Sequence, residues 1–166
     1  MTENDLILLA EEVVEKLKKS NTTLAVAESC TGGWLSKLIT DVSGASAIYK
    51  GGVCSYSNEI KIKLLGVKEE TLATEGAVSS STATQMATGV RKALNTDIGV
   101  GITGIAGPNS DNTSKPVGLI YIAVADENGV QVTQLNNSFT ENIRTNNRLS
   151  ALHTALNILS SIGDYK

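Results

Sequence analysis

The chain has 166 residues, a formal net charge of −3 and 41% hydrophobic residues, with only 4% aromatic. A chain of this length is expected to form a single domain, residues 1–166, whose aliphatic core buries roughly two thirds of the unfolded surface. The slightly negative charge argues against a broad nucleic-acid surface, and the sequence contains no apolar run of about 18 residues that would span a membrane.

Cysteine and histidine residues are scarce in the chain. The two cysteines, Cys30 and Cys54, follow no basic and apolar leader, so we expect a cytoplasmic protein with free thiols. The one histidine, His153, falls within a predicted helix and is interpreted as a helix-surface residue. These residues form no recognisable zinc site, so no metal is expected.

The predicted elements of the N-terminal half alternate between helix and strand. Residues 3–19 place apolar side chains on one helical stripe, with Thr2 as the predicted N-cap. A buried strand begins near Thr22, and a helix follows over residues 35–41. The next elements are a strand over 47–56 and helices over 57–65, 68–74 and 79–94. The paired glycines at 51 and 52 indicate a bulge or a place where a ligand or another backbone approaches closely.

The C-terminal half is predicted to add three strands and a final helix. Residues 98–102 form a strand, and the strands over 117–125 and 130–135 form a hairpin closed near Asn128 and Gly129. The loop over 109–115 is polar, and the last helix covers residues 142–161. This order predicts an α/β fold: three α/β/α layers around a mixed, mostly parallel sheet, with a C-terminal hairpin and helix.

The turn over residues 27–34, with the sequence AESCTGGW, joins the first predicted strand to the helix that follows it. Small residues in such a turn leave backbone N–H groups free at the positive end of the helix dipole, where an anion or a developing oxyanion is stabilised. Ser29 is well placed for chemistry at this bend. The alternative is structural, with Ser29 or Thr31 capping the helix and the glycines allowing close packing.

A second turn of small residues follows the strand over 98–102 and begins with Thr103 and Gly104. In α/β sheets, ligands bind beyond the carboxyl ends of the strands. Both turns leave their strands at that end, so we expect them to face one crevice. Tyr56, at the end of another predicted strand, is within reach of the same crevice.

A serine hydroxyl needs a neighbouring base before it becomes a good nucleophile. Because the one histidine is assigned to a helix surface, the candidate base is Lys61, made neutral by burial, as in known Ser-Lys sites. Tyr56 would relay the proton or hold the lysine and serine in position. Cys30 is the rival nucleophile, since adjacent residues on a tight turn point in different directions and only one faces the crevice.

Six motifs in order resemble the CinA C-terminal domain family, and together they cover nearly the whole chain. They are TLAVAESCTGG at 23–33, YSNE at 56–59 followed by Lys61, residues 64–67, EGAVS at 75–79, GIAGP at 104–108 and KPVG at 115–118. That family includes stand-alone nicotinamide-nucleotide amidases. The chain shows no preceding domain, so it is similar to the stand-alone form.

The resemblance implies hydrolysis of nicotinamide mononucleotide to nicotinic acid mononucleotide and ammonia, without a metal or other cofactor. By motif, Ser29 would be the nucleophile, Lys61 its base and Tyr56 the residue that couples them. The substrate would be bound by the turn and by residues further along the chain: an oxyanion hole from backbone N–H groups near Cys30, Thr31, Gly32 and Gly33, a nucleotide site lined by Thr103 and Gly104, and a phosphate contact from Lys115.

The sequence departs from the family pattern at two places. Relatives commonly carry glycines after GIAGP, whereas residues 109–112 are Asn-Ser-Asp-Asn. Relatives also carry a Gly-Asp-Arg-like turn after the phenylalanine, whereas Phe139 is followed by residues 140–144, which place Arg144 one position away. Either change would weaken phosphate recognition.

Two other functions are weighed against the amidase. The first, suggested by the altered stretches 109–112 and 141–144, is a module that binds a nucleotide without turning it over. The second, suggested by the family name alone, is a structural or partner-binding domain linked to competence or DNA damage. The expected partner is a small nucleotide rather than nucleic acid or membrane, and the sequence leaves monomer and homo-oligomer open.

Overall fold

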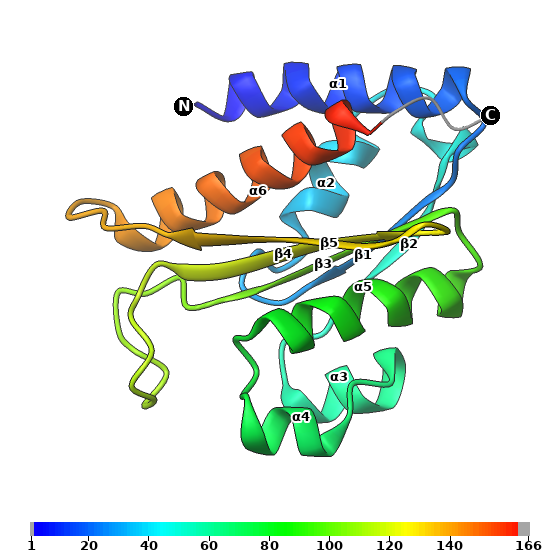
Figure 1. Ribbon diagram of the computed structural model, residues 1–166. Coiled ribbons are helices and arrows are strands. Elements are labelled where there is room, and N and C mark those ends of the chain that lie inside the picture. Colours follow the sequence, from blue (N-terminus) through cyan, green and yellow to red (C-terminus); the bar gives the residue numbers. More distant parts are fainter. Residues whose placement is uncertain (1, 163–166) are drawn as a thin grey trace.

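The computed structural model describes residues 2–162, which build one five-stranded sheet in the order β2-β1-β3-β4-β5. The strands are β1 (Leu24–Glu28), β2 (Tyr49–Cys54), β3 (Ile98–Gly104), β4 (Leu119–Asp126) and β5 (Gly129–Asn136). The first three are parallel, and β4 and β5 continue the sheet in antiparallel pairing. Helices cover both faces (Figure 1), which confirms the predicted three-layer α/β/α fold.

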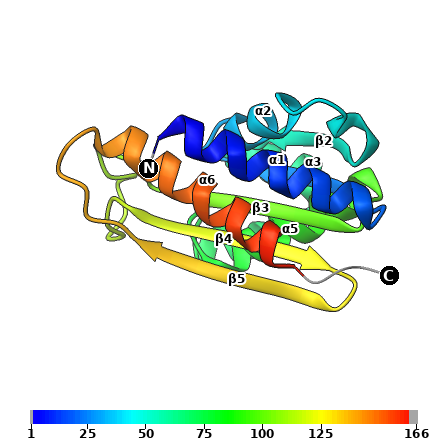
Figure 2. The ribbon, with the colours of Figure 1, turned by 90° about the horizontal axis from the view of Figure 1, so that it is seen from above.

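The helices divide between the two faces of the sheet (Figure 1). One face carries α1 (Glu3–Lys19), α2 (Trp34–Thr40) and α6 (Ile143–Ser161), and the other carries α3 (Asn58–Leu65), α4 (Glu69–Thr74) and α5 (Ser80–Leu94). A short 3₁₀ turn, Ala45–Ala47, precedes β2. Figure 2 shows α1 and α6 side by side above the sheet, where the Lys16 ammonium donates to the Ser160 carbonyl at 2.6 Å.

The ends of the helices follow the signals in the sequence. Thr2 caps α1 through a reciprocal hydrogen bond with Asp5, and Ser57 caps α3 by accepting from the Ile60 amide. Gly66 ends α3 in the left-handed conformation. The cap at Ser57 determines where α3 begins, so it also determines where Lys61 lies on that helix.

The glycines of β2 and β3 allow close contacts that no larger residue would permit. A Cβ on Gly101 would lie 2.5 Å from the Ala83 carbonyl oxygen of α5, so the glycine lets α5 rest directly on the sheet. In β2 the register shifts between Tyr49 and Gly51, and a Cβ on Gly52 would lie 2.7 Å from the Tyr49 hydroxyl. The register shift confirms the predicted bulge at the paired glycines, whereas the atoms that approach Gly52 belong to side chains rather than to another backbone.

Strand β3 extends two residues beyond its predicted end. Thr103 and Gly104 belong to the strand because β4 pairs with them, opposite Tyr121 and Ile120. The sequence predicted a turn there, and the antiparallel partner strand overrides it. These two residues still mark the carboxyl end of β3.

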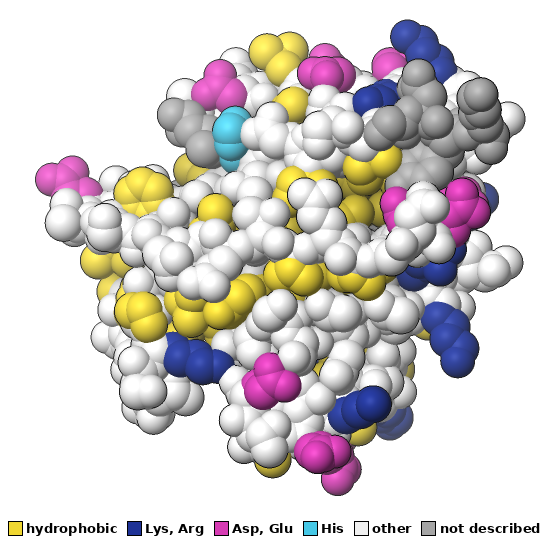
Figure 3. Space-filling view, viewed as in Figure 1, with side chains coloured by type: hydrophobic (Ala, Val, Ile, Leu, Met, Phe, Trp, Pro, Cys, Tyr) yellow, Lys and Arg dark blue, Asp and Glu magenta, His cyan; other side chains and the backbone are white. Residues whose placement is uncertain are grey.

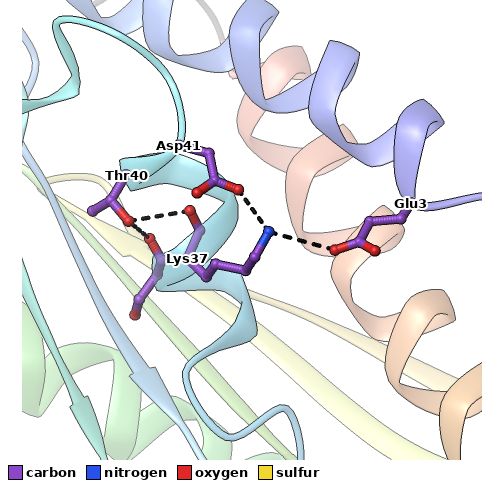
Figure 4. Close-up of polar contacts among 5 residues, drawn as sticks. Glu3, Lys37, Thr40 and Asp41 are labelled. Atoms are coloured by element: carbon purple, nitrogen blue, oxygen red, sulfur yellow. Dashed lines mark hydrogen bonds and ion pairs between the residues drawn. The ribbon is translucent and has the colours of Figure 1, made fainter.

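Surface ion pairs join α2 to α1. Figure 4 shows the Lys37 ammonium between Asp41, at 2.7 Å, and Glu3, at 3.5 Å. All three side chains are largely exposed, so this cluster contributes little to stability. On the face drawn in Figure 3, basic and acidic side chains are scattered rather than gathered into a basic patch. Within residues 2–162, each helix is too short or too polar to cross a bilayer.

Candidate active site

Ser29 lies at the point where β1 turns toward α2. Its amide donates to the Ile102 carbonyl of β3 at 3.0 Å, and its carbonyl accepts from the Gly32 amide at 3.1 Å. The carbonyl of the preceding Glu28 accepts from the Ser55 amide at 2.8 Å. The backbone around Ser29 is therefore held by both neighbouring strands, while its hydroxyl faces a cavity.

The helix after this turn is capped by Glu28, and the structural alternative of a Ser29 or Thr31 cap is wrong. The N-cap residue is Gly33, in the left-handed conformation and without a side-chain cap of its own. The Glu28 carboxylate instead accepts from the amides of Gly33, Leu35 and Ser36 at 2.9–3.1 Å, and from the Ser36 hydroxyl at 2.8 Å. A longer side chain from the strand takes the place of the expected short cap.

Lys61 reaches Ser29 from α3, on the opposite face of the sheet from α2. The lysine Nζ donates to the Ser29 Oγ at 3.0 Å and to the Ser55 carbonyl oxygen at 2.6 Å. Its side chain is only 1% exposed. The serine and the lysine, 32 positions apart in sequence, are therefore in direct contact.

Burial shifts the pKa of both ionisable groups next to Ser29, the Lys61 amine downward and the Cys30 thiol upward. Burial lowers the pKa of Lys61 from its ordinary 10.5 to about 8. Among residues 2–162 no carboxylate lies within ion-pair distance of it. Burial also raises the pKa of the Cys30 thiol to about 12, so the neighbouring cysteine is held in its unreactive form. The electrostatics favour Ser29 over Cys30.

Tyr56 lies at the rim of the site and is 67% exposed. Its hydroxyl accepts from the Arg144 Nη2 at 3.3 Å, and the Arg144 Nη1 donates to the Gly107 carbonyl at 2.9 Å. The hydrogen bonds of Tyr56 thus connect it to Arg144 rather than to Ser29 or Lys61. Arg144 is the second residue of α6, so the helix start delivers its guanidinium to the rim.

A cavity of about 240 Å³ opens at the carboxyl ends of β1 and β3. The two turns predicted to share one crevice both contribute to it. The predicted site residues that line it are Ser29, Cys30, Tyr56, Lys61, Thr103 and Gly104; the others, Thr31, Gly32, Gly33 and Lys115, are outside its lining. Asn109, Ser110, Asp111 and Arg144 also contribute to its wall.

The backbone amides of the turn divide into two groups. Those of Gly32 and Gly33 are occupied, the first by the Ser29 carbonyl and the second by the Glu28 carboxylate. Those of Cys30 and Thr31 donate to no oxygen within residues 2–162. Of these two residues, Cys30 lines the cavity beside Ser29, whereas Thr31 is fully buried and outside the lining.

Lys115 is bonded to the protein rather than directed into the cavity. Its ammonium donates to the carbonyls of Glu75 and Val78, each at 2.5 Å. The same segment receives a hydrogen bond from the Thr103 hydroxyl, which donates to the Ala77 carbonyl at 2.7 Å. Both residues therefore hold the segment that contributes Ala77 and Val78 to the cavity wall.

Two residues of the site have roles that the sequence analysis did not assign. Glu28 carried a signal, because it is the one acidic residue in an otherwise apolar strand and precedes a Gly-Gly pair. From the sequence, Arg144 lies one position away from the arginine of the family pattern. In the structure it nevertheless lies in the cavity wall, because α6 begins one residue before it. Within residues 2–162, no cluster of three or more His, Cys, Asp or Glu side chains could hold a metal ion.

Comparisons with known proteins agree on one family. The sequence matches the CinA C-terminal domain over residues 7–162. It is 46% identical over 134 residues to the nicotinamide-nucleotide amidohydrolase PncC of Escherichia coli (strain K12), which covers 81% of each chain.

Two further relatives carry names that refer to competence and damage. A competence-damage inducible protein of Thermoanaerobacter sp. (strain X514) is 52% identical over 145 residues, 87% of this chain and 35% of that protein. This chain therefore spans about a third of that relative. The crystal structure of the competence/damage inducible protein CihA from Agrobacterium tumefaciens superposes with a TM-score of 0.88 and 38% identity, covering 93% of both chains.

Proposed function

Because this chain belongs to the CinA C-terminal domain family, as its match over residues 7–162 shows, we propose that it hydrolyses nicotinamide mononucleotide to nicotinic acid mononucleotide and ammonia. The chain is an amidase, as is the PncC relative that it matches over 81% of both lengths. The observation that carries the proposal is the 3.0 Å contact between the Lys61 Nζ and the Ser29 Oγ. Such a contact between a hydroxyl and an amine is what nucleophilic catalysis requires.

The reaction begins with attack by Ser29. Neutral Lys61 takes the proton of the Ser29 hydroxyl as its oxygen bonds to the carboxamide carbon. The tetrahedral oxyanion is assigned to the backbone amide of Cys30, which lines the cavity beside Ser29 and has no acceptor oxygen within residues 2–162. Lys61 then gives the proton to the departing nitrogen, and ammonia leaves an ester on Ser29.

Water completes the cycle by hydrolysing that ester. Lys61, neutral again, removes a proton from the water as the water attacks the acyl carbon. The proton returns to the Ser29 oxygen as the ester bond breaks, and the nicotinic acid mononucleotide is released. The Ser55 carbonyl accepts a hydrogen bond from the amine throughout, which keeps its nitrogen directed at the serine.

The nucleotide end of the substrate is assigned to the rim of the cavity. Arg144 has five N–H donors, of which two have acceptors within residues 2–162, so several are available for a phosphate. We assign the phosphate to Arg144 rather than to Lys115, because both partners of the Lys115 ammonium are protein carbonyls. Tyr56 positions Arg144, and Thr103 and Gly104 form the wall beside the nucleotide.

One observation favours a second candidate function, binding of a nucleotide without turnover. Asp111 lies in the cavity wall, where its carboxylate repels an anionic substrate, and its Oδ1 is fixed by hydrogen bonds from the Thr113 amide and hydroxyl. A substrate that sits too far from Ser29 would bind without reacting.

Ammonia release from purified protein tests the proposal. We expect release from nicotinamide mononucleotide to exceed release from nicotinamide and from nicotinamide riboside, and to disappear in Ser29→Ala. The control is Cys30→Ala, which should keep activity because the thiol is buried and protonated. Tight binding in calorimetry without ammonia over hours would favour the binding module, and activity that depends on Cys30 instead of Ser29 would reassign the nucleophile.

A further inference from the structure

The buried carboxylate at the end of β1 lies directly before the proposed nucleophile and takes no part in the mechanism above. Glu28 is 1% exposed and accepts four hydrogen bonds. Its Oε2 serves the amides of Gly33 and Leu35, and its Oε1 serves the amide and hydroxyl of Ser36. Every one of these donors belongs to the first residues of α2 or to its N-cap.

We propose that Glu28 is a positioning residue for the chemistry of Ser29: its carboxylate occupies the N-terminus of α2, and it thereby fixes the turn that holds the Ser29 hydroxyl against the Lys61 amine. This inference rests on the proposed function, since it concerns the same nucleophile. It assigns Glu28 no contact with the substrate.

The hydrogen bonds around the turn support this role. The segment from Ser29 to Gly33 is closed at its start by the Ser29 amide on Ile102 and at its end by the Gly33 amide on Glu28. An internal bond from the Gly32 amide to the Ser29 carbonyl completes the loop. The carbonyls of Thr31 and Gly33 are also hydrogen-bonded, to Trp34 and Arg148 and to Lys37, so removing the Glu28 acceptor loosens the far end rather than releasing it. A displacement of about 1 Å in a reacting group still lowers the rate of a reaction by about 10²-fold.

The position of the negative charge has two further consequences. A carboxylate at the positive end of a helix satisfies the orphan amides that would otherwise attract an anion, so the substrate phosphate has no site at α2. The charge also adds to burial in raising the pKa of the Cys30 thiol. Glu28 therefore helps to keep the thiol protonated while the adjacent hydroxyl reacts.

The test compares Glu28→Gln with Ser36→Ala. A glutamine keeps the shape but replaces one acceptor oxygen with an NH₂ group, which faces backbone donors that it cannot satisfy. Ser36→Ala removes one donor from the same carboxylate and leaves the bonds to Gly33 and Leu35 in place. Steady-state kinetics with nicotinamide mononucleotide, circular dichroism and thermal unfolding are measured for both variants and for the wild type.

We expect Glu28→Gln to be folded at the assay temperature, with kcat lowered by about 10²-fold and KM changed by less than about threefold. Ser36→Ala should keep kcat within about threefold of the wild type. A purely structural role would lower the melting temperature of Glu28→Gln and leave kcat unchanged, and that result would overturn the proposal. If Glu28→Gln does not fold, Glu28→Asp, which retains the charge but shortens the reach, should lose about tenfold in kcat, and an unchanged kcat would overturn the proposal equally.

A second experiment tests the role of Glu28 independently of the proposed substrate. The wild type and Glu28→Gln are treated with p-nitrophenyl acetate, which needs no nucleotide site, and acetylation of Ser29 is followed by mass spectrometry. Slower acetylation in Glu28→Gln supports the positioning role even if nicotinamide mononucleotide proves not to be the substrate. Equal rates in the two proteins, or no acetylation of Ser29 in the wild type, would overturn it.

Discussion

Two buried ionisable side chains flank Ser29, Glu28 on the side of α2 and Lys61 on the side of α3, and they are held in opposite ways. Both are 1% exposed. Glu28 receives four hydrogen bonds, all from protein donors in one helix end. Lys61 has two acceptors, a carbonyl and the hydroxyl of Ser29, and no carboxylate partner within residues 2–162.

The difference is the physical reason why we propose Lys61, and not Glu28, as the base. A buried charge costs free energy unless hydrogen bonds and opposite charges compensate it. Glu28 is compensated and stabilises local structure. Lys61 is not, so its pKa falls to about 8 and the amine becomes able to accept a proton near neutral pH. The residue with the poorer set of partners is the one suited to act as a base.

The same reasoning distinguishes two cations further along the cavity wall. The Lys115 ammonium donates to two carbonyls of the protein, whereas the guanidinium of Arg144 at the rim has donors that no acceptor within residues 2–162 engages. We therefore expect Arg144 to bind substrate and Lys115 to stabilise the wall.

The largest effect is expected for Lys61→Met. Without a base for Ser29, kcat/KM for nicotinamide mononucleotide should fall by about 10³-fold. The matched control is Lys63→Met, two positions along the same helix. Substantial activity in Lys61→Met would show that Lys61 is not the base, and it would contradict the contrast drawn between Lys61 and Glu28.

The activity of the wild type should rise with pH. The amine must be neutral to act, and its pKa is about 8, so kcat/KM should increase about tenfold per pH unit below 8 and level off above it. The measurement is ammonia release across pH 6–10. A profile that is flat through pH 8 would show that no group of this kind limits the reaction.

Lys61→Met should also stabilise the protein at pH 7. The folded state disfavours the charged amine, so the wild type carries a penalty on the order of 1–3 kcal/mol that the methionine lacks. Between pH 8 and pH 10.5, the ordinary pKa of lysine, the unfolded chain binds a proton at Lys61 that the folded protein does not bind. The stability of the wild type should therefore rise with pH in this range, and the difference in stability between the wild type and Lys61→Met should become smaller. Urea unfolding at pH 7 and pH 10 measures both changes, and a less stable variant at pH 7 would contradict the contrast.

Arg144→Gln should weaken binding more than turnover. Loss of the guanidinium should raise KM for nicotinamide mononucleotide about tenfold, with kcat changed much less. Nicotinamide riboside lacks the phosphate, so its KM should be the same in both proteins. An equal change for the two substrates would contradict the phosphate assignment.

The smallest effect is expected for Lys115→Met. Losing the hydrogen bonds to Glu75 and Val78 should lower the free energy of unfolding by about 1–2 kcal/mol and leave KM for the nucleotide nearly unchanged. Lys92→Met, on the exposed side of α5, is the control for loss of a positive charge. A large rise in KM with unchanged stability would restore Lys115 as a phosphate ligand.

The local signals of the chain predicted the fold well because they act over a few residues. Some backbone requirements can be recognised from a few neighbouring residues alone. Examples are the helix caps at Thr2 and Ser57, the left-handed end of α3 at Gly66 and the paired glycines of β2. The end of β3 was less readable, since pairing with β4 extended it. The cap of α2 was missed because its acceptor comes from the preceding strand rather than from the usual position beside the helix.

The sequence by itself determined the order of the elements, the family and the residue types available for chemistry, because periodicity, turn residues and ordered motifs are local properties of the chain. Only the tertiary structure decided which of those residues meet: Lys61 with Ser29, Tyr56 with Arg144, and Lys115 with protein carbonyls. Contacts, burial and the pKa shifts that follow from them depend on segments far apart in sequence, and these become neighbours only when the sheet and its two helical layers assemble.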